Sequence, residues 1–273
     1  MTQAEKGRRF RALHERDEAF IVPNPWDAGT ARLLAHLGFE ALATTSAGYA
    51  FSVGKRDGTI GRDETLEHVA AIASATDLPV SADLENGFGD TPESVAETIK
   101  LAAQAGAVGG SIEDAFRNGK ENESYELERA VDRVRAAAEA ARSLPFPFTL
   151  TARAENYLVG KPDLKDATKR LQAYQDAGAN VLYAPGLTSE KDIAAVVGSV
   201  DRPVNVLMGL QGVQLPLAAL SAIGVKRISV GSALSRAALG AFLRAAQEMR
   251  QHGTFTFSEQ AVSYRDVSAM FPE

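Results

Sequence analysis

Cysteine is missing from all 273 residues of the chain. Its absence excludes disulfide bonds, thiolate nucleophiles and cysteine-ligated zinc from the chemistry of this protein. Long apolar runs are also missing, since no stretch approaches the roughly 20 apolar residues of a transmembrane helix. The first twenty residues read as a charged helix without the apolar centre of a signal peptide. We therefore expect a cytoplasmic protein with no membrane partner.

Positive charge is in short supply. The formal net charge is -6, with 29 basic against 35 acidic residues. The field of such a chain repels phosphates, which argues against a nucleic-acid partner. The 45% hydrophobic and 23% charged residues are otherwise those of an ordinary globular protein. An anionic small substrate would therefore need local help from an arginine, backbone N–H groups or a metal.

Short apolar runs alternate with longer alanine-rich segments of helical period along almost the whole chain. This alternation is typical of repeated βα units and a parallel sheet. Eight strands and no break in composition favour an α/β fold of the (β/α)8 TIM barrel type, formed by residues 1–273 as one domain. An open nucleotide-binding sheet is disfavoured, because no Gly-x-Gly-x-x-Gly follows the first strand. The predicted strands are Ala19 to Val22, Ala41 to Thr44, Pro79 to Ala82, Ala107 to Ile112, Phe148 to Ala152, Asn180 to Tyr183, Val204 to Leu207 and Arg227 to Val230.

The helices between these strands are predicted from their caps and periodicity. Thr91 before Pro92 is a strong start signal, so Pro92 to Ala105 should be helical. Gly38, Gly106 and Gly178 are expected to end three helices in the left-handed conformation. The other predicted helices are Asp27 to Leu37, Asp63 to Thr76, Tyr125 to Ser143, Leu164 to Ala177, Ser189 to Val197, Pro216 to Ile223 and Leu234 to Gln251.

The C-terminal extension, residues 254–273, is too apolar for a solvated tail. It contains Phe255, Phe257, Tyr264, Met270 and Phe271. We expect this extension to pack on another surface, such as that of a neighbouring subunit.

Two acidic clusters follow the third and fourth predicted strands. Asp83 and Glu85 alternate along a strand end, so both should point into the barrel mouth. Glu113 and Asp114 face opposite ways, which favours Glu113 for the centre and Asp114 for a bond to loop backbone. Carboxylates that repel one another commonly share a hard divalent cation. Asp83, Glu85 and Glu113 are therefore the predicted ligands of Mg²⁺ or Mn²⁺, although Asp83 could instead cap the following turn.

Arg153 and Glu155 share a face where the fifth strand ends. Arg153 could bind a substrate carboxylate through two parallel hydrogen bonds. It could also pair with Glu155 or Asp83 inside the barrel, and both interpretations can be true. Asn205, on the seventh strand, is a further inward polar candidate for substrate binding.

The loop after the second strand is built of small residues whose backbone N–H groups are accessible. Such a loop can hold a carboxylate or a phosphonate, although its hydroxyls could also be simple helix caps. The predicted substrate-binding residues of this loop are Thr45, Ser46, Ala47 and Gly48.

Two further loops offer candidate catalytic residues. Asp57 follows Lys55 and Arg56; it is either a turn residue or an acid whose pKa the two cations lower. The polar segment 117–124 is either a disordered connection or a lid. A lid would bring Lys120 or Asn122 over the substrate.

Taken together, these motifs resemble those of the isocitrate lyase and phosphoenolpyruvate mutase superfamily. The resemblance extends from about Phe20 to Ala238. It rests on Pro-Asn-Pro-Trp-Asp-Ala at 23–28, Thr-Ser-Ala-Gly at 45–48, Lys-Arg-Asp at 55–57, Ala-Asp-Leu-Glu-Asn-Gly-Phe-Gly at 82–89, Ile-Glu-Asp at 112–114 and Ala-Arg-Ala-Glu at 152–155.

The resemblance implies Mg²⁺ held, directly or through water, by the acids that match Asp83, Glu85 and Glu113. It implies a 2-oxo acid or its enolate on that metal, with the anionic end at the Thr45 to Gly48 loop. Arg153 matches the substrate-binding arginine of the family, and Asp57 an acid near the reacting group. Homo-oligomers, usually tetramers that exchange the last helix between barrels, are also implied; a dimer is the smaller alternative.

Two departures narrow the expected activity. Isocitrate and methylisocitrate lyases carry a catalytic cysteine in a Lys-Lys-Cys-Gly-His loop, and this chain has no cysteine. Mutases place a histidine where Pro185 stands. The second metal acid is Glu85, where many members have the shorter aspartate.

The leading hypothesis is a Mg²⁺-dependent lyase that cleaves a C–C bond next to a 2-oxo or 2-hydroxy carboxylate, resembling oxaloacetate decarboxylase. Cleavage of a 2-hydroxy acid would need a base, for which Asp57, Tyr49 and Tyr183 are candidates. C–P chemistry on phosphonopyruvate, by a mutase or hydrolase, is the second hypothesis. The third is a non-catalytic binder of 2-oxo dicarboxylates.

Overall fold

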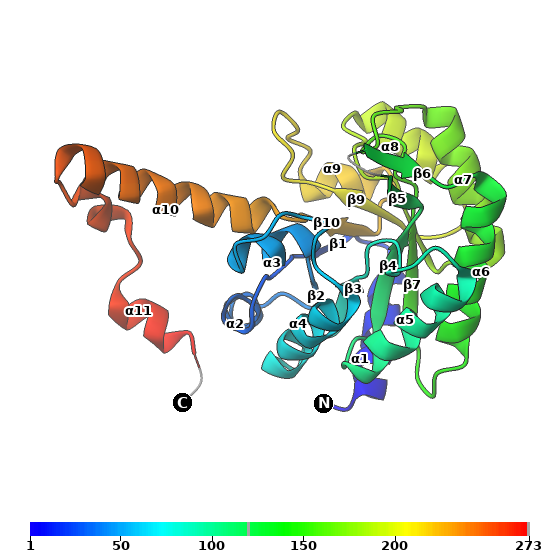
Figure 1. Cartoon of the computed structure of the whole chain (residues 1–273), viewed down its shortest axis with the longest axis horizontal. Helices are drawn as coiled ribbons and strands as arrows, with labels where there is room; N and C mark the ends of the chain where they lie inside the picture. The colour runs from blue at the N-terminus through cyan, green and yellow to red at the C-terminus, as the bar shows by residue number, and fades with distance from the viewer. Residues whose placement is uncertain (119–120, 272–273) are drawn as a thin grey trace.

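A computed structural model describes residues 1–118 and 121–271, and within it eight strands form one parallel sheet. The strand order is β1-β10-β9-β8-β7-β4-β3-β2. A backbone hydrogen bond of 3.1 Å from Ala43 N to Pro23 O joins the two edges, so the sheet nearly closes. The predicted α/β barrel is thereby confirmed (Figure 1). The strands are β1 (Phe20–Val22), β2 (Leu42–Ala43), β3 (Val80–Asp83), β4 (Gly109–Glu113), β7 (Thr149–Arg153), β8 (Val181–Tyr183), β9 (Val204–Leu207) and β10 (Arg227–Ser229).

Helices follow the strands and cover the outside of the barrel (Figure 1). The Thr91 hydroxyl accepts a hydrogen bond from Ser94 N, as expected of the cap before Pro92. Gly38, Gly106 and Gly178 all have positive φ, which confirms the three glycine caps. The helices are α1 (Gln3–His14), α2 (Ala28–His36), α3 (Ser46–Ser52), α4 (Arg62–Ala75), α5 (Pro92–Gln104), α6 (Leu127–Arg142), α7 (Leu164–Ala177), α8 (Glu190–Val197), α9 (Leu217–Ala222), α10 (Ala233–His252) and α11 (Tyr264–Ala269), with a 3-10 turn, η1 (Thr256–Gln260).

The N-terminal helix α1 seals the lower end of the barrel. Its Phe10 and Leu13 are fully buried against Phe20 and Val22 of β1. Burial of such apolar side chains contributes roughly 1.5–3 kcal/mol each. A functional site is therefore expected at the opposite end of the barrel, beyond the carboxyl ends of the strands.

The segment that was a candidate disordered connection is instead a β-hairpin. β5 (Ala115–Asn118) pairs antiparallel with β6 (Glu121–Ser124). Phe116 stacks on Tyr125, with ring centroids 4.6 Å apart. Of the two interpretations of this segment, the disordered connection is wrong for the described residues, and the lid stays a prediction.

The C-terminal segment projects away from the barrel as an arm (Figure 1). Only Ser235 of α10 is buried, and η1 and α11 bury none of their residues. Large apolar side chains stay exposed along it, including Phe242, Leu243 and Tyr264. None of the helices in the described ranges combines the length and apolar character that crossing a bilayer requires.

Candidate active site at the C-terminal end of the barrel

A cavity of about 480 Å³ opens where the parallel strands end. In barrels of this type the loops at this end carry the active site. Side chains that follow β2, β3, β4, β7 and β8 all line it, although the sequence separates them by more than a hundred residues. The fold therefore brings together most of the polar motifs that the sequence analysis singled out.

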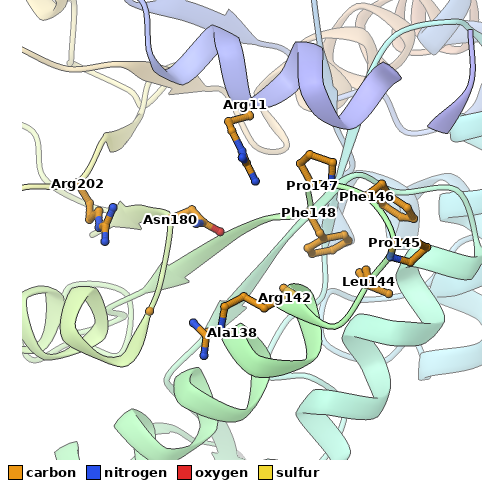
Figure 2. Close-up of a pocket in the computed structure, with 12 residues that line it drawn as sticks. Arg11, Ala138, Arg142, Leu144, Pro145, Phe146, Pro147, Phe148, Asn180 and Arg202 are labelled. Carbon is orange, nitrogen blue, oxygen red and sulfur yellow. The ribbon is translucent and has the colours of Figure 1, made fainter. Parts of the chain in front are cut away.

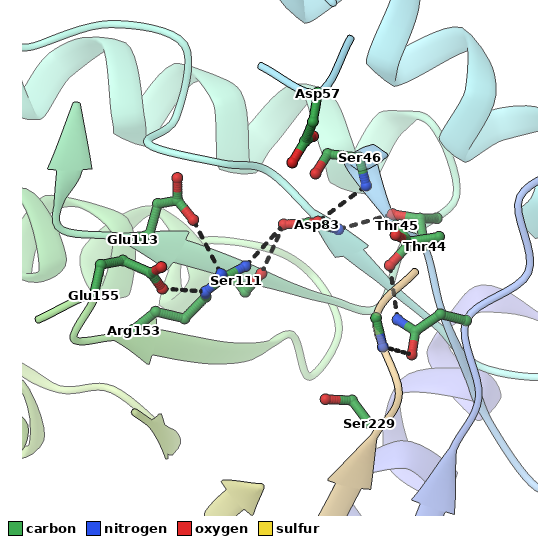
Figure 3. A network of polar contacts seen from close by, with 12 residues as sticks. Thr44, Thr45, Ser46, Asp57, Asp83, Ser111, Glu113, Arg153, Glu155 and Ser229 are labelled. Carbon is green, nitrogen blue, oxygen red and sulfur yellow. Dashed lines mark hydrogen bonds and ion pairs between the residues drawn. The ribbon is translucent and has the colours of Figure 1, made fainter. Parts of the chain in front are cut away.

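Arg153 stands at the centre of the polar wall (Figure 3). Its Nη1 lies 3.2 Å from Asp83 Oδ1, its Nη2 lies 3.2 Å from Glu113 Oε2, and its Nε lies 2.7 Å from Glu155 Oε1. The guanidinium also lies 5.1 Å from the ring centre of Tyr183. The expected ion pairs with Glu155 and Asp83 are confirmed, and Glu113 adds a third.

The charges of this cluster are strongly coupled. Burial raises the pKa of Glu113 well above its ordinary value, although Arg153 opposes this shift. The pKa of Glu155 is raised for the same first reason. Burial alone would lower the pKa of Arg153, but the surrounding carboxylates hold it well above its ordinary value. Three carboxylates thus share the single positive charge of Arg153, so a further cation would stabilise the cluster.

Asp83 links this cluster to the loop after β2. Its Oδ2 accepts a 3.0 Å hydrogen bond from Ser46 N, at the start of α3. Its own backbone N–H donates to the Thr44 hydroxyl at 2.8 Å. Asp83 therefore caps the first turn of α3 and not the turn that follows β3 (Figure 3).

The predicted substrate loop is partly a helix. Thr45 is the N-cap of α3, because its side chain accepts from Gly48 N. Thr45, Ser46 and Ala47 line the cavity. Gly48 is buried behind it, where an added Cβ would lie 2.6 Å from Thr45 Cγ2. Gly48 is thus required for packing, whereas its three neighbours face the cavity.

Asp57 lines the same cavity, on the side of Ser46 (Figure 3). The expectation that its two neighbouring cations lower its pKa was wrong. Loss of hydration, followed by the negative charge of Asp83, raises the pKa of Asp57. Lys55 is engaged elsewhere, with its Nζ 2.8 Å from Glu64 Oε2.

The three predicted metal ligands share the cavity, but not by simple strand alternation. β3 ends at Asp83, and Glu85 has a positive φ of 47° in the loop beyond it. Glu85 and Glu113 both line the cavity with Asp83. In the described part of the chain, no three acidic or histidine side chains stand close enough together to form a metal cluster, because Arg153 lies among these acids.

Asp114 faces away from the cavity, as its alternation with Glu113 predicted. Its Oδ1 accepts from Glu155 N at 2.8 Å, and its Oδ2 lies 2.9 Å from Arg170 Nη1. Tyr174 donates to the same Oδ2. Asp114 therefore holds the loop that carries Glu155 in place.

The remaining candidate residues differ in whether they line the cavity. Asn122, on β6, lines the cavity. Lys120 lies outside the described residues. Asn205 is buried below the cavity, where it donates to Ser229 Oγ at 2.9 Å and accepts from Arg227 Nε at 2.9 Å. Asn205 is not among the residues that line the cavity, so the expected direct contact with substrate has no support here.

An apolar wall completes the cavity, and the sequence analysis did not identify it. The wall comes from loops whose shape a sequence does not specify, although one signal was available: Leu158 and Val159 follow the Arg153 motif after two intervening residues. Its members are Ile60, Phe88, Phe116, Leu158, Val159 and Leu207.

Comparison with known proteins identifies the family. A family model described as phosphoenolpyruvate phosphomutase matches residues 10–250. The chain belongs to the isocitrate lyase and phosphoenolpyruvate mutase superfamily. Among curated relatives, the 2-methylisocitrate lyase of Salmonella typhimurium is 34% identical over 69% of this chain and 65% of its own. The oxaloacetate decarboxylase of Chromohalobacter salexigens is 28% identical over 88% of this chain and 84% of its own.

A solved structure is more similar still. A protein of Burkholderia cenocepacia J2315, described as a candidate lyase or mutase, is 64% identical over 98% of this chain and 95% of its own, with a TM-score of 0.95. The superfamily resemblance drawn from the strand-end motifs is thus confirmed. Superfamily members act as lyases, hydrolases and mutases, so membership establishes an enzyme family without selecting one reaction.

Proposed function

We propose that this protein is a Mg²⁺- or Mn²⁺-dependent lyase that cleaves a C–C bond next to a 2-oxo or 2-hydroxy carboxylate. The arrangement of Arg153 among Asp83, Glu113 and Glu155, facing the Ser46 loop across one cavity, carries the proposal. It presents a fixed positive group to an anionic substrate and surplus carboxylates to a cation. Small oxo acids carry the matching negative charge.

The residues present fit a divalent cation. Asp83, Glu85 and Glu113 offer hard oxygen donors that suit Mg²⁺ or Mn²⁺. Mg²⁺ keeps several waters, so acids that also contact Arg153 can hold it through its hydration shell. A solved phosphonopyruvate hydrolase of similar fold is described as a complex with oxalate and Mg²⁺. When bound, the cation would supply Lewis-acid stabilisation of negative charge on the substrate oxygens.

Arg153 has the geometry of a substrate-positioning residue. Its three ion pairs fix the guanidinium plane, and its remaining N–H groups are available to a substrate oxygen. Because the guanidinium does not reorganise during the reaction, it stabilises an enolate as the charge develops. The apolar wall, with Phe116 and Leu158, excludes water that would compete for those donors.

Asp57 is the best-placed group to move a proton. Its pKa is raised, so it accepts and returns a proton more readily near neutrality than an ordinary aspartate. In decarboxylation, the C–C bond breaks to release carbon dioxide and leave an enolate, which then takes a proton on carbon. In cleavage of a 2-hydroxy acid, Asp57 would first remove the hydroxyl proton.

A second function, C–P cleavage of a phosphonate, keeps support from the family model, which is described as a phosphomutase. Pro185 lines the cavity at the position where mutases have a histidine, and this favours the C–C lyase. The two reactions differ in their products. Phosphonopyruvate hydrolysis releases inorganic phosphate, whereas C–C cleavage does not.

The deciding experiment measures product release from oxaloacetate, malate-like acids and phosphonopyruvate, with Mg²⁺ and with EDTA. We expect Mg²⁺-dependent turnover of at least one of the C–C substrates. Turnover of phosphonopyruvate alone would favour the second function. If nothing is turned over while 2-oxo acids raise the melting temperature, the protein is a binder and not an enzyme.

The metal proposal has its own test in Asp83→Ala and Glu85→Ala. Loss of an outer partner of a metal ligand already costs about 10–100-fold in metal affinity or activity, so loss of a ligand itself should cost at least as much. We expect activity to fall by at least that factor, and the Mg²⁺ concentration for half-maximal activity to rise where activity is measurable. Unchanged activity and Mg²⁺ dependence in both variants would end the metal proposal. Glu67→Ala, on the outer helix α4, is the matched control.

We also propose that the protein is a homo-oligomer, a tetramer or a dimer, in which α10 contacts a second barrel. The exposed apolar residues of the arm support this proposal, since water-exposed Phe242 and Leu243 stabilise nothing in the single chain.

A further inference from the structure

A second cavity of about 480 Å³ opens at the opposite end of the barrel from the candidate active site (Figure 2). Its lining comes from the segments that enter the strands: Phe148 precedes β7, Asn180 precedes β8, and Arg202 lies just before β9. Arg11 of α1 and Arg142 at the end of α6 complete the rim. The volume is in the range of small-molecule sites.

Three arginines from three separate parts of the chain line this cavity: Arg11, Arg142 and Arg202 (Figure 2). The lining residues, all within the described ranges, include no aspartate or glutamate. Across the described part of the chain, none of these three arginines forms an ion pair, whereas Arg16 and Arg135 do. In a chain of net charge -6, this local excess of positive charge is unbalanced and attracts an anion.

The surroundings orient the polar groups of the cavity. Gly178 has a φ of +108°, and a Cβ added to it would lie 2.7 Å from Arg142 Nη1, so the guanidinium packs against the bare glycine. The Oδ1 of Asn180 accepts from Leu150 N at 2.8 Å. Because this bond engages the side-chain oxygen of Asn180, its amide nitrogen is left as a further hydrogen-bond donor at the cavity.

Most of the remaining lining is apolar and comes from the segment between α6 and β7. Leu144, Pro145, Phe146, Pro147 and Phe148 form it. An adjoining cavity of about 400 Å³ shares Arg11, Phe148, Asn180 and Arg202, so the combined space exceeds that of a bare inorganic ion. Glu15 also lines this adjoining cavity, so the combined space carries one carboxylate against three arginines. The site thus pairs a cationic rim with an apolar surface.

We propose that this cavity binds a phosphate-bearing small molecule, with its phosphate on the three arginines and its apolar part on the Pro147 and Phe148 surface. The guanidinium fork matches phosphate oxygens through paired hydrogen bonds. A phosphate dianion also offsets the mutual repulsion of three cations better than a single carboxylate does. This ligand is separate from the substrate of the candidate active site, which lies at the other end of the strands.

Calorimetry with phenyl phosphate, in low-salt buffer with EDTA so that no divalent metal contributes, tests the proposal. The wild-type protein should bind saturably, more tightly than it binds benzoate, and less tightly as salt is raised. Arg11→Ala, Arg142→Ala and Arg202→Ala should each weaken binding by about fivefold, the scale of an exposed charge pair. Arg8→Ala, an exposed residue of α1 that does not line the cavity, is the matched control.

Hydrogen exchange locates the bound molecule. Phenyl phosphate should protect backbone amides of residues 142–150 and 178–181, and leave those of 83–88 unchanged. The proposal is overturned if no saturable binding is seen, if benzoate binds equally well, if Arg8→Ala weakens binding as much as the other three variants, or if protection appears at 83–88 alone. Circular dichroism of each variant confirms folding, which these exposed substitutions should preserve.

Discussion

At the scale of single residues, the carboxylates of the candidate site outnumber its positive charges. Asp83, Glu113 and Glu155 all contact Arg153, so one guanidinium is shared by three carboxylates. Asp57 stands close enough for the charge of Asp83 to raise its pKa. Burial raises the pKa values of Glu113, Glu155 and Asp57, and such shifts are the expected signature of a functional cluster.

Substitution of Asp57 tests this charge balance directly. Its pKa is higher in the folded protein than in the unfolded chain, so ionisation of Asp57 destabilises the fold. That penalty is absent below the unfolded pKa and complete above the folded pKa. Asp57→Asn should therefore raise the melting temperature at pH 7, and not at pH 3. After allowance for solvent screening we expect a few tenths of a kcal/mol, about 1 °C.

The same variant should lose activity, because asparagine cannot carry a proton between groups. A fall in kcat of about a hundredfold or more is typical when a general acid or base is removed. Calorimetric melting at the two pH values and steady-state kinetics check the two effects. Full activity in Asp57→Asn would assign the proton transfer to another group, such as Tyr183, whose pKa burial raises to about 12.

At the scale of elements, short caps hold the site in register. The Thr45 side chain caps α3, and the Ser46 N–H of the same turn donates to Asp83. Thr45 and Ser46 thus link the stability of α3 to the position of Asp83, a proposed metal ligand. The eight-residue helix α8 has a similar cap at Ser189, but it lies on the outside of the barrel.

Removing the Thr45 cap and the Ser189 cap in separate variants distinguishes an effect on stability from an effect on activity. Thr45→Ala and Ser189→Ala should each lower the free energy of unfolding by about 1 kcal/mol. Only Thr45→Ala should also lower kcat/KM, by roughly tenfold or more, since small displacements at a catalytic site are costly. Denaturant unfolding and kinetics on both variants give the comparison. Equal activity in the two would show that α3 does not position Asp83.

The sequence determined the elements far better than the loops. Period and caps located all eight strands, and the order of acids at strand ends brought Asp83 and Glu113 together correctly. The sequence could not show that residues 46–52 form a helix, because Ser-Ala-Gly-Tyr carries no distinctive helical pattern. Nor could the sequence show that Glu113 also pairs with Arg153, or that Asn205 bonds Ser229 and Arg227, since such contacts depend on the distances between strands.

At the scale of the whole molecule, the arm is the feature that a single chain leaves unexplained. α10 extends for 20 residues beyond the barrel and buries only Ser235. Leu239, Phe242 and Leu243 are three and four residues apart, so they form one apolar stripe on the helix. A second copy of the chain supplies a matching surface by symmetry, which makes a closed homo-oligomer the simplest solution.

Charge on that stripe should break the assembly while leaving the barrel folded. Phe242→Asp with Leu243→Asp places two carboxylates in the proposed interface, where burying unpaired charge is prohibitive. Light scattering should then show monomers in place of dimers or tetramers, with an unchanged circular dichroism spectrum. Arg244→Asp and Gln251→Asp together add the same number of carboxylates to the other side of α10 and serve as the control. If the wild-type chain is already monomeric at micromolar concentration, the arm has another role and the oligomer proposal fails.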